Sequence, residues 1–128
     1  MKLILDTHAL LWWLDGDRKL SRKVRAVLEA SEAEVLVSAA TVWEITTKAR
    51  LGKLPGALDV ARDVLACVAG QGFEMLDITG AHAQHAGSLR GAHRDPFDRM
   101  LIAQSLLEGA SLATNEELFD EFGVARFW

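Results

Sequence analysis

Two aspartates, Asp95 and Asp98, mark the start of the clearest predicted helix in the chain. Asp95 precedes Pro96, an order typical of a helix N-cap followed by the first helical residue, because proline lacks an N–H that this position leaves unpaired. Leu101 and Ile102 follow Asp98 by three and four residues, so its carboxylate should share a helix face with bulky apolar side chains. Both acids also have a purely structural explanation, which is that their negative charge stabilises the positive N-terminal end of the helix dipole. An acid on an apolar face is also a candidate for chemistry.

Asp6 and Glu44 are acids at two other junctions between a predicted strand and a predicted helix. Asp6 ends the apolar run 2–5, at the point where parallel sheets place their ligands, but it can also cap the next helix, as Thr7 can. Lys48 follows Glu44 by four residues, the spacing of an ion pair worth about 0.2 to 0.5 kcal/mol on an exposed helix face. At each acid, the structural and the functional explanations are both open.

The elements that must position these acids alternate along the chain as strands and helices. Short apolar runs predict strands, and amphipathic spacing after a serine, threonine or aspartate cap predicts helices. Strands are expected over 2–5, 34–37, 73–76 and 111–113, with an edge strand or tail over 124–128. Helices are expected over 7–14, 21–31, 38 to beyond 45, 58–69, 79–89 and 96–108, with a last helix beginning at 114–117.

This alternation predicts an α/β fold with a central parallel sheet flanked by helices. Right-handed crossovers bring the carboxyl ends of all strands to one edge of the sheet. The acids expected to gather at that edge are Asp6, Glu44, Asp98 and Glu116. Carboxylates this close repel one another unless cations intervene, and oxygen ligands suit Mg²⁺ or Mn²⁺. Such sites commonly activate water for attack on a phosphate, which needs no side-chain nucleophile.

Composition limits the alternatives. The 128 residues are half hydrophobic, which suits one domain with its own core, and no apolar run approaches the roughly 20 residues that span a bilayer. The single cysteine, Cys67, excludes an internal disulfide and fits a reducing compartment, so we expect a cytoplasmic protein. The net charge of −4 excludes a global basic footprint for nucleic acid. Metal ions and a local basic rim, such as Lys48, Arg50 and Lys53, would have to offset the acids.

Other phosphate and metal motifs are missing or incomplete. The chain has no phosphate-binding glycine loop and no Ser-His-Asp arrangement at a nucleophile elbow. A phosphoaspartate hydrolase would need a second aspartate two residues after Asp6, where the chain has His8. His82 and His85 have the spacing of some zinc sites, but no third ligand accompanies them in the sequence.

With these residues in order, the sequence resembles a PIN domain, and in particular the toxin subunit of VapBC-type toxin–antitoxin pairs. The matching motifs are Leu3-Ile4-Leu5-Asp6-Thr7-His8, Val42-Trp43-Glu44-Ile45, the block from His93 through Asp95-Pro96-Phe97-Asp98-Arg99 to Gln104, and Ala113-Thr114-Asn115-Glu116. The resemblance covers the whole chain, residues 1–128, as one PIN domain. It implies a parallel sheet with helices on both sides and a Mg²⁺- or Mn²⁺-dependent ribonuclease that cleaves RNA phosphodiester bonds.

The resemblance implies roles for particular residues of this sequence. Asp6 and Asp98 would be the main metal ligands, and Glu44 a third acid that binds metal or orients water. Glu116 departs from the family pattern, in which an aspartate commonly stands two residues after the threonine, so one tightly held metal ion is expected. The supporting positions are Thr7, Asp95, Thr114 and Asn115.

The resemblance also implies a homodimer and a small cognate antitoxin that covers the acidic pocket. Trp12, Trp13 and Trp43 are candidates for the groove that receives the antitoxin, although core packing is the simpler explanation for most of them. Two other functions stay open. One is a noncatalytic PIN module that binds RNA or a protein partner, and the other is a metal-dependent phosphatase or DNA nuclease that uses the same acids.

Overall fold

Short apolar runs form the strands of this protein because a parallel sheet can bury them on both faces. The structure, a computed structural model, describes all residues from 1 to 128. Its sheet comprises β1 (Lys2–Leu5), β2 (Glu34–Ser38), β3 (Glu74–Leu76), β4 (Ser111–Ala113) and β5 (Arg126–Phe127). All neighbouring strands are parallel, in the order β3-β2-β1-β4-β5, which confirms the predicted α/β fold.

Helices fill the connections between the strands. They are α1 (Thr7–Asp15), α2 (Arg22–Ala30), α3 (Ala39–Arg50), α4 (Leu58–Arg62), α5 (Val64–Gly70), α6 (Gly80–Ser88) and α7 (Pro96–Glu108), with the short 3₁₀ helices η1 (Pro55–Ala57) and η2 (Glu117–Phe122). Ser21, Ser38 and Thr79 cap the helices that follow them, each with a side-chain oxygen that accepts a backbone N–H. None of the helices has the length and apolar character needed to cross a membrane.

Two of the predicted helices differ from the expectation. The helix predicted over 58–69 is two helices, because Asp63 leaves the helical conformation (φ −158°, ψ 81°) and its side chain accepts a hydrogen bond from Ala66 N to start α5. The helix predicted to begin at 114–117 is the 3₁₀ helix η2, which ends at Gly123 in the left-handed conformation. Neither difference moves a strand end, so the expected positions of the acids are unchanged.

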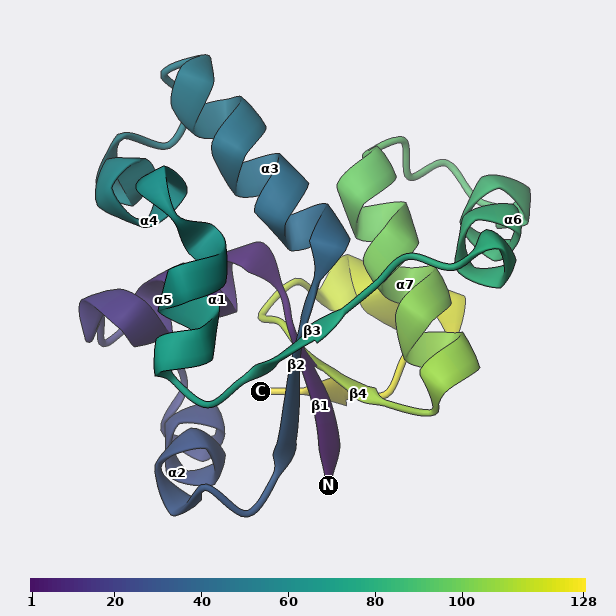
Figure 1. Cartoon of the computed structure of the whole chain (residues 1–128). Coiled ribbons are helices and arrows are strands. Elements are labelled where there is room, and N and C mark those ends of the chain that lie inside the picture. Colours follow the sequence, from purple (N-terminus) through teal and green to yellow (C-terminus); the bar gives the residue numbers. More distant parts are fainter.

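Side chains along the strands alternate between two cores, one on each face of the sheet. Leu3 and Leu5 belong to a core with residues of α1, α2 and α5, whereas Ile4 and Leu112 belong to a core with residues of α7 and η2. Figure 1 shows α1, α2, α4 and α5 on one side of the sheet and α6 and α7 on the other. This two-residue period fixes the register, since a slip of one residue would exchange the two cores.

The strand order changes direction at β1. The chain steps outward from β1 to β2 and β3, and then returns to place β4 on the other side of β1. Asp6 N donates a hydrogen bond to Ala113 O at 3.1 Å, which joins the carboxyl ends of β1 and β4. Open parallel sheets bind ligands outside the carboxyl ends of their strands at such a switch point. The residues that follow β1 and β4 therefore lie where a site is expected.

Candidate active site

The Asp6 carboxylate lies at the switch point, directly after β1. Its Oδ1 accepts a hydrogen bond from Ala9 N at 2.7 Å, which caps α1, and the residue is only 6% exposed. Asp6 thus has the capping role that was open from the sequence. That role leaves room for chemistry, because the hydrogen bond from Ala9 engages only one of the two carboxylate oxygens.

Thr114, Asn115 and Glu116 follow β4 on the other side of the switch point. The buried Thr114 hydroxyl accepts a hydrogen bond from Glu116 N at 3.1 Å, which holds the turn. Glu116 is half-buried, whereas Asn115 is exposed. Hydrogen bonding from Thr114 lowers the pKa of Asp6, and the charge of Glu116 raises it. Glu116 therefore lies within electrostatic reach of Asp6.

Glu44 reaches the same edge of the sheet from α3, and both of its carboxylate oxygens have a partner. The Thr7 hydroxyl donates a hydrogen bond to Oε1, and the Lys48 ammonium donates one to Oε2. The ion pair that the four-residue spacing predicted is present, but Glu44 is only 6% exposed, so this is not a surface pair. Breaking such a pair costs more than breaking a surface pair, because the remaining charge stays buried.

Asp98 lies in the first turn of α7, and Asp95 fixes where that helix begins. Asp95 Oδ1 accepts hydrogen bonds from Phe97 N at 2.9 Å and from Asp98 N at 3.2 Å, so Asp95 is the N-cap that the Asp-Pro order predicted. Asp98 does not cap the helix. Its Oδ2 forms a hydrogen bond with His93 Nε2 at 2.8 Å, and 20% of its side chain is exposed. Asp98 can therefore face a ligand in solution.

The pKa values of Asp6 and Asp98 show that each of these buried carboxyl groups lies near the same two further acids, Glu44 and Glu116. Burial is the largest cause that raises the pKa of each from its ordinary value of 3.8 to about 6. The charges of Glu44 and Glu116 raise both pKa values as well, and Asp95 adds to the effect on Asp98. The four acids expected to converge from different parts of the chain are thus electrostatic neighbours at one edge of the sheet.

One cation, Lys48, lies among these acids. Partial burial lowers the pKa of its ammonium, but the hydrogen bond to Glu44 and the charges of Glu44, Asp95 and Asp98 outweigh burial and raise the pKa overall. Lys48 therefore stays protonated at neutral pH and balances part of the negative charge of the cluster. Its side chain is 30% exposed, so the ammonium lies at the border between the acids and solvent.

The donor set suits a hard divalent cation by type and charge. Asp6 and Asp98 are carboxylates whose raised pKa values would be reversed by a nearby cation. The buried hydroxyl of Thr41, one turn before Glu44 on the same face of α3, has no hydrogen-bond partner. As the side chains are oriented, however, no group of three or more histidine, cysteine or acidic residues is arranged to hold a metal ion. The residues fit Mg²⁺ or Mn²⁺ chemically, while Glu44 is held by Thr7 and Lys48.

The raised pKa values predict how stability varies with pH in the metal-free protein. A carboxyl group with a raised pKa binds its proton more tightly in the folded state, so its contribution to stability is full below pH 3.8 and is lost as the pH rises through about 6. In the presence of a chelator, the free energy of unfolding should fall by about 1 kcal/mol per carboxyl group between roughly pH 5 and 7. Thermal melts across this range measure it. The D6N/D98N double variant should lack this slope, and an equal slope in that variant would contradict the assignment.

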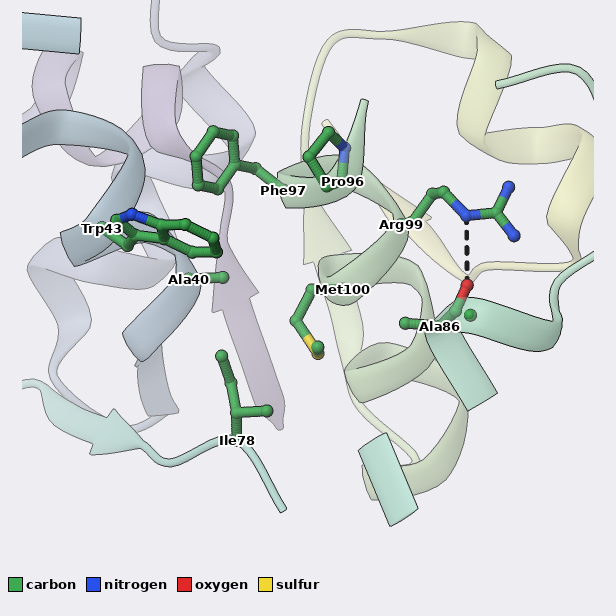
Figure 2. Close-up of a pocket in the computed structure, with 9 residues that line it drawn as sticks. Ala40, Trp43, Ile78, Ala86, Pro96, Phe97, Arg99 and Met100 are labelled. Carbon is green, nitrogen blue, oxygen red and sulfur yellow. Dashed lines mark hydrogen bonds between the residues drawn. The ribbon is translucent and has the colours of Figure 1, made fainter. Parts of the chain in front are cut away.

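Arg99 holds the loop that carries His93. Its guanidinium donates hydrogen bonds to Ala86 O at 3.1 Å, to His93 O at 2.9 Å and to Leu89 O. Figure 2 shows the first of these bonds, which joins α7 to the end of α6. Gly91 in the same loop has φ +129°, and a Cβ there would lie 3.0 Å from Phe122 Cε1, so the loop requires glycine at this position.

Sequence reasoning gave no role to His93 or Arg99, although both stand in the motif around Asp98. His93 bonds Asp98 through Nε2, and its ring packs at 6.3 Å from the Phe119 ring and 6.4 Å from the Phe122 ring, measured between centroids. The only signal was that a histidine and an arginine flank an Asp-Pro cap. That signal does not predict that the loop carrying His93 folds back onto the first turn of α7.

The histidines considered for zinc have other surroundings. His82 is buried, its Nε2 bonds Glu108 Oε2 at 3.0 Å, and its Nδ1 accepts from Thr79 N at 3.1 Å, so both ring nitrogens serve the start of α6 and its packing on α7. His85 is half-buried and belongs to no group that could hold a metal ion. His8 is exposed and lies 5.5 Å from the Trp12 ring between ring centroids.

Comparison with known proteins gives the same fold. A family model described as the PIN domain matches residues 3–125. A chain of the DNA-bound VapBC from Salmonella typhimurium has a TM-score of 0.69 and 21% identity, covering 98% of this chain and 96% of that one. A chain of VapBC2 from Rickettsia felis, bound to a promoter DNA fragment, has a TM-score of 0.68 and 18% identity, covering 100% of both. FitAcB from Neisseria gonorrhoeae has a TM-score of 0.67 and 23% identity, covering 98% and 96%.

No sequence among the curated proteins matches the chain. The parallel sheet with acidic residues gathered at its switch point defines an α/β protein with a carboxylate site. Because the PIN model matches almost the whole length of the chain, the chain belongs to the PIN domain family. Members of this family are generally nucleases, so the protein is assigned to the hydrolases that act on nucleic acids.

Proposed function

We propose that this protein is a Mg²⁺- or Mn²⁺-dependent endoribonuclease. The observation that carries the proposal is that acids following β1 and β4 lie near acids on α3 and α7: burial raises the pKa of Asp6 and Asp98 to about 6, and the charges of Glu44 and Glu116 raise both pKa values further. Asp6 and Asp98 would hold the metal, with Glu44 and Glu116 as further acids. A divalent ion bound there supplies an activated water and neutralises charge on the phosphoryl oxygens.

The other residues of the site hold these acids in place. Ala9 N orients Asp6, His93 orients Asp98, and Thr7 fixes one oxygen of Glu44. Lys48 keeps the second oxygen of Glu44 and presents a cation at the border of the cluster, where a phosphate would approach. No side chain of the cluster has to act as a nucleophile, because water attacks the phosphodiester.

We also propose that the protein is the toxin of a type II toxin–antitoxin pair. The support is the likeness of its fold to chains of the VapBC complexes from Salmonella typhimurium and Rickettsia felis. A small cognate antitoxin would cover the acid cluster and block access of RNA. In this role the protein acts in the cytoplasm as a homodimer.

The experiment that tests the nuclease proposal compares substrates and metals. Purified protein is incubated with structured RNA, single-stranded DNA and a small phosphate ester, each with Mg²⁺, with Mn²⁺ or with excess chelator. We expect RNA cleavage that requires the metal and is lost in chelator. Preferred turnover of DNA or of the ester would replace the ribonuclease with another metal-dependent phosphate hydrolase. Binding of RNA without turnover of any substrate would leave a noncatalytic PIN module.

A further inference from the structure

An apolar pocket of about 220 Å³ opens between α3, α6 and α7. Trp43 and Ala40 line it from α3, and Phe97 and Met100 line it from α7. In Figure 2 the side chains of Trp43, Phe97 and Met100 point toward the same space. None of the acids proposed to hold the metal lines this pocket. It is therefore a separate feature of the surface that the hydrolysis itself does not use.

Two aromatic rings that line the pocket, those of Trp43 and Phe97, contact each other. The centroids of the Trp43 and Phe97 rings are 5.0 Å apart and their planes cross at 78°, an edge-to-face contact that holds both rings in place. Trp43 is nevertheless 60% exposed, the highest value among the large apolar side chains. A fixed and exposed indole has the form of a platform for a flat partner.

The pocket lies beside the acid cluster on the same two helices. Trp43 immediately precedes Glu44 on α3, and Phe97 immediately precedes Asp98 on α7. Consecutive residues of a helix point about 100° apart, so the aromatic rings occupy the face next to the one that carries the acids. A nucleic-acid strand with one phosphate at Glu44 and Asp98 would therefore place an adjacent nucleotide near Trp43 and Phe97.

The charges around the pocket favour a neutral flat group attached to an anionic chain. Arg99 lines the pocket, but its guanidinium is engaged by the carbonyl groups of Ala86, Leu89 and His93, so the pocket offers no free charge. The cation nearest to the neighbouring acids is Lys48, which bonds Glu44, the residue that follows Trp43 on α3, and feels the charges of Asp95 and Asp98. Aromatic side chains that lie near a cation are the combination that binds the bases and backbone of single-stranded nucleic acids.

We propose that the Trp43–Phe97 pocket binds an unpaired nucleobase of the RNA, next to the phosphodiester that the acids hydrolyse. This inference rests on the proposed nuclease function and adds its base-binding subsite. Stacking of a base on an aromatic side chain is worth about 1 to 3 kcal/mol and tolerates any base. The pocket therefore selects single-stranded over paired RNA, because a paired base cannot leave its stack without cost.

Binding to uncleaved strands tests this subsite separately from catalysis. In a D6N background, the affinity for labelled single-stranded poly-U and poly-A oligonucleotides is measured by fluorescence anisotropy. We expect W43A to weaken binding by about 5- to 150-fold and W43F, which keeps an aromatic face, to stay within a few-fold of the parent. L65A removes a comparably exposed apolar side chain on α5 and should leave the affinity unchanged. Strands that carry one abasic nucleotide, each at a different position, locate the base that binds. At one position the W43A variant and its parent should bind the strand with equal affinity, because the base that stacks on Trp43 is missing.

The outcomes separate the two proposals. Equal affinities of W43A and its parent for all oligonucleotides, or no binding of either strand, would overturn the subsite even if wild-type protein cleaves RNA. A concentration-dependent dimer that W43A dissociates, with RNA affinity unchanged, would assign the pocket to a second copy of the chain and overturn it too. If the W43A effect requires a base at one position of the strand but the protein cleaves no substrate, the result would support the subsite and overturn the nuclease function.

Discussion

Replacing Asp98 by asparagine is expected to lower metal-dependent RNA cleavage at least about 10³-fold and, at the same time, to stabilise the metal-free protein. The loss corresponds to about 4 kcal/mol of transition-state stabilisation, because asparagine removes both a ligand oxygen and its charge. The gain arises because asparagine carries no charge that burial and neighbouring acids can penalise. Because the pKa of Asp98 is about 6, D98N should exceed the metal-free wild-type protein in free energy of unfolding by roughly 1 to 3 kcal/mol above pH 7.

D6N should behave in the same way, since asparagine is also a good N-cap for α1. Steady-state cleavage assays measure the activity, and urea denaturation in chelator measures the stability. D59N is the matched control, because the Asp59 side chain is 95% exposed on α4 and should change neither quantity. Wild-type cleavage rates in both D6N and D98N would end the nuclease proposal. Loss of activity together with loss of stability would show that the acids serve the fold instead.

Replacing Arg99 by alanine is expected to lower the free energy of unfolding by about 3 kcal/mol and to reduce cleavage in the fraction that stays folded. The guanidinium makes hydrogen bonds to the carbonyl groups of Ala86, Leu89 and His93, and hydrogen bonds of charged donors are worth about 1.5 to 3 kcal/mol each when their partners lose them. Water that hydrogen-bonds to the freed carbonyl groups would offset part of this loss of stability. Release of the loop also frees His93 from Asp98.

Urea denaturation measures the stability of R99A, and R99K tests whether charge alone is sufficient. Lysine has the charge but not the planar fork that reaches several carbonyl groups, so R99K should recover less than half of the loss. R90A is the control, because Arg90 is exposed in the same loop and should change stability by no more than about 0.5 kcal/mol. An unchanged denaturation midpoint in R99A would mean that water replaces the guanidinium at all three carbonyl groups.

The sheet and the meeting place of the acids were predictable because few physical rules determine them. A strand buried on both faces reads as an apolar run, as in Lys2–Leu5, and parallel crossovers place every strand end at one edge. Caps such as Ser38 and Asp95 are local, since each acts on a backbone N–H two or three residues later. Asp6 and Asp98 could therefore be placed at the same edge without any knowledge of side-chain contacts.

The remaining features depend on contacts that helix and strand periods do not describe. The bond between His93 and Asp98 crosses the start of α7, where no fixed period relates the two residues. The partners of Arg99 are backbone carbonyl groups, which every residue has. The spacing of Glu44 and Lys48 predicted their pair, but not that packing around α3 would leave Glu44 only 6% exposed. No glycine or proline signals the break at Asp63.

The Lys48 ammonium is a counter-ion that the chain itself supplies to the acid cluster. A newly synthesised molecule already carries an internal counter-ion, which moderates repulsion among its carboxylates before any ion from solution arrives. A divalent ion that bound Glu44 as proposed would have to displace this ammonium, which stays tethered to α3 and would be available to return when the ion leaves.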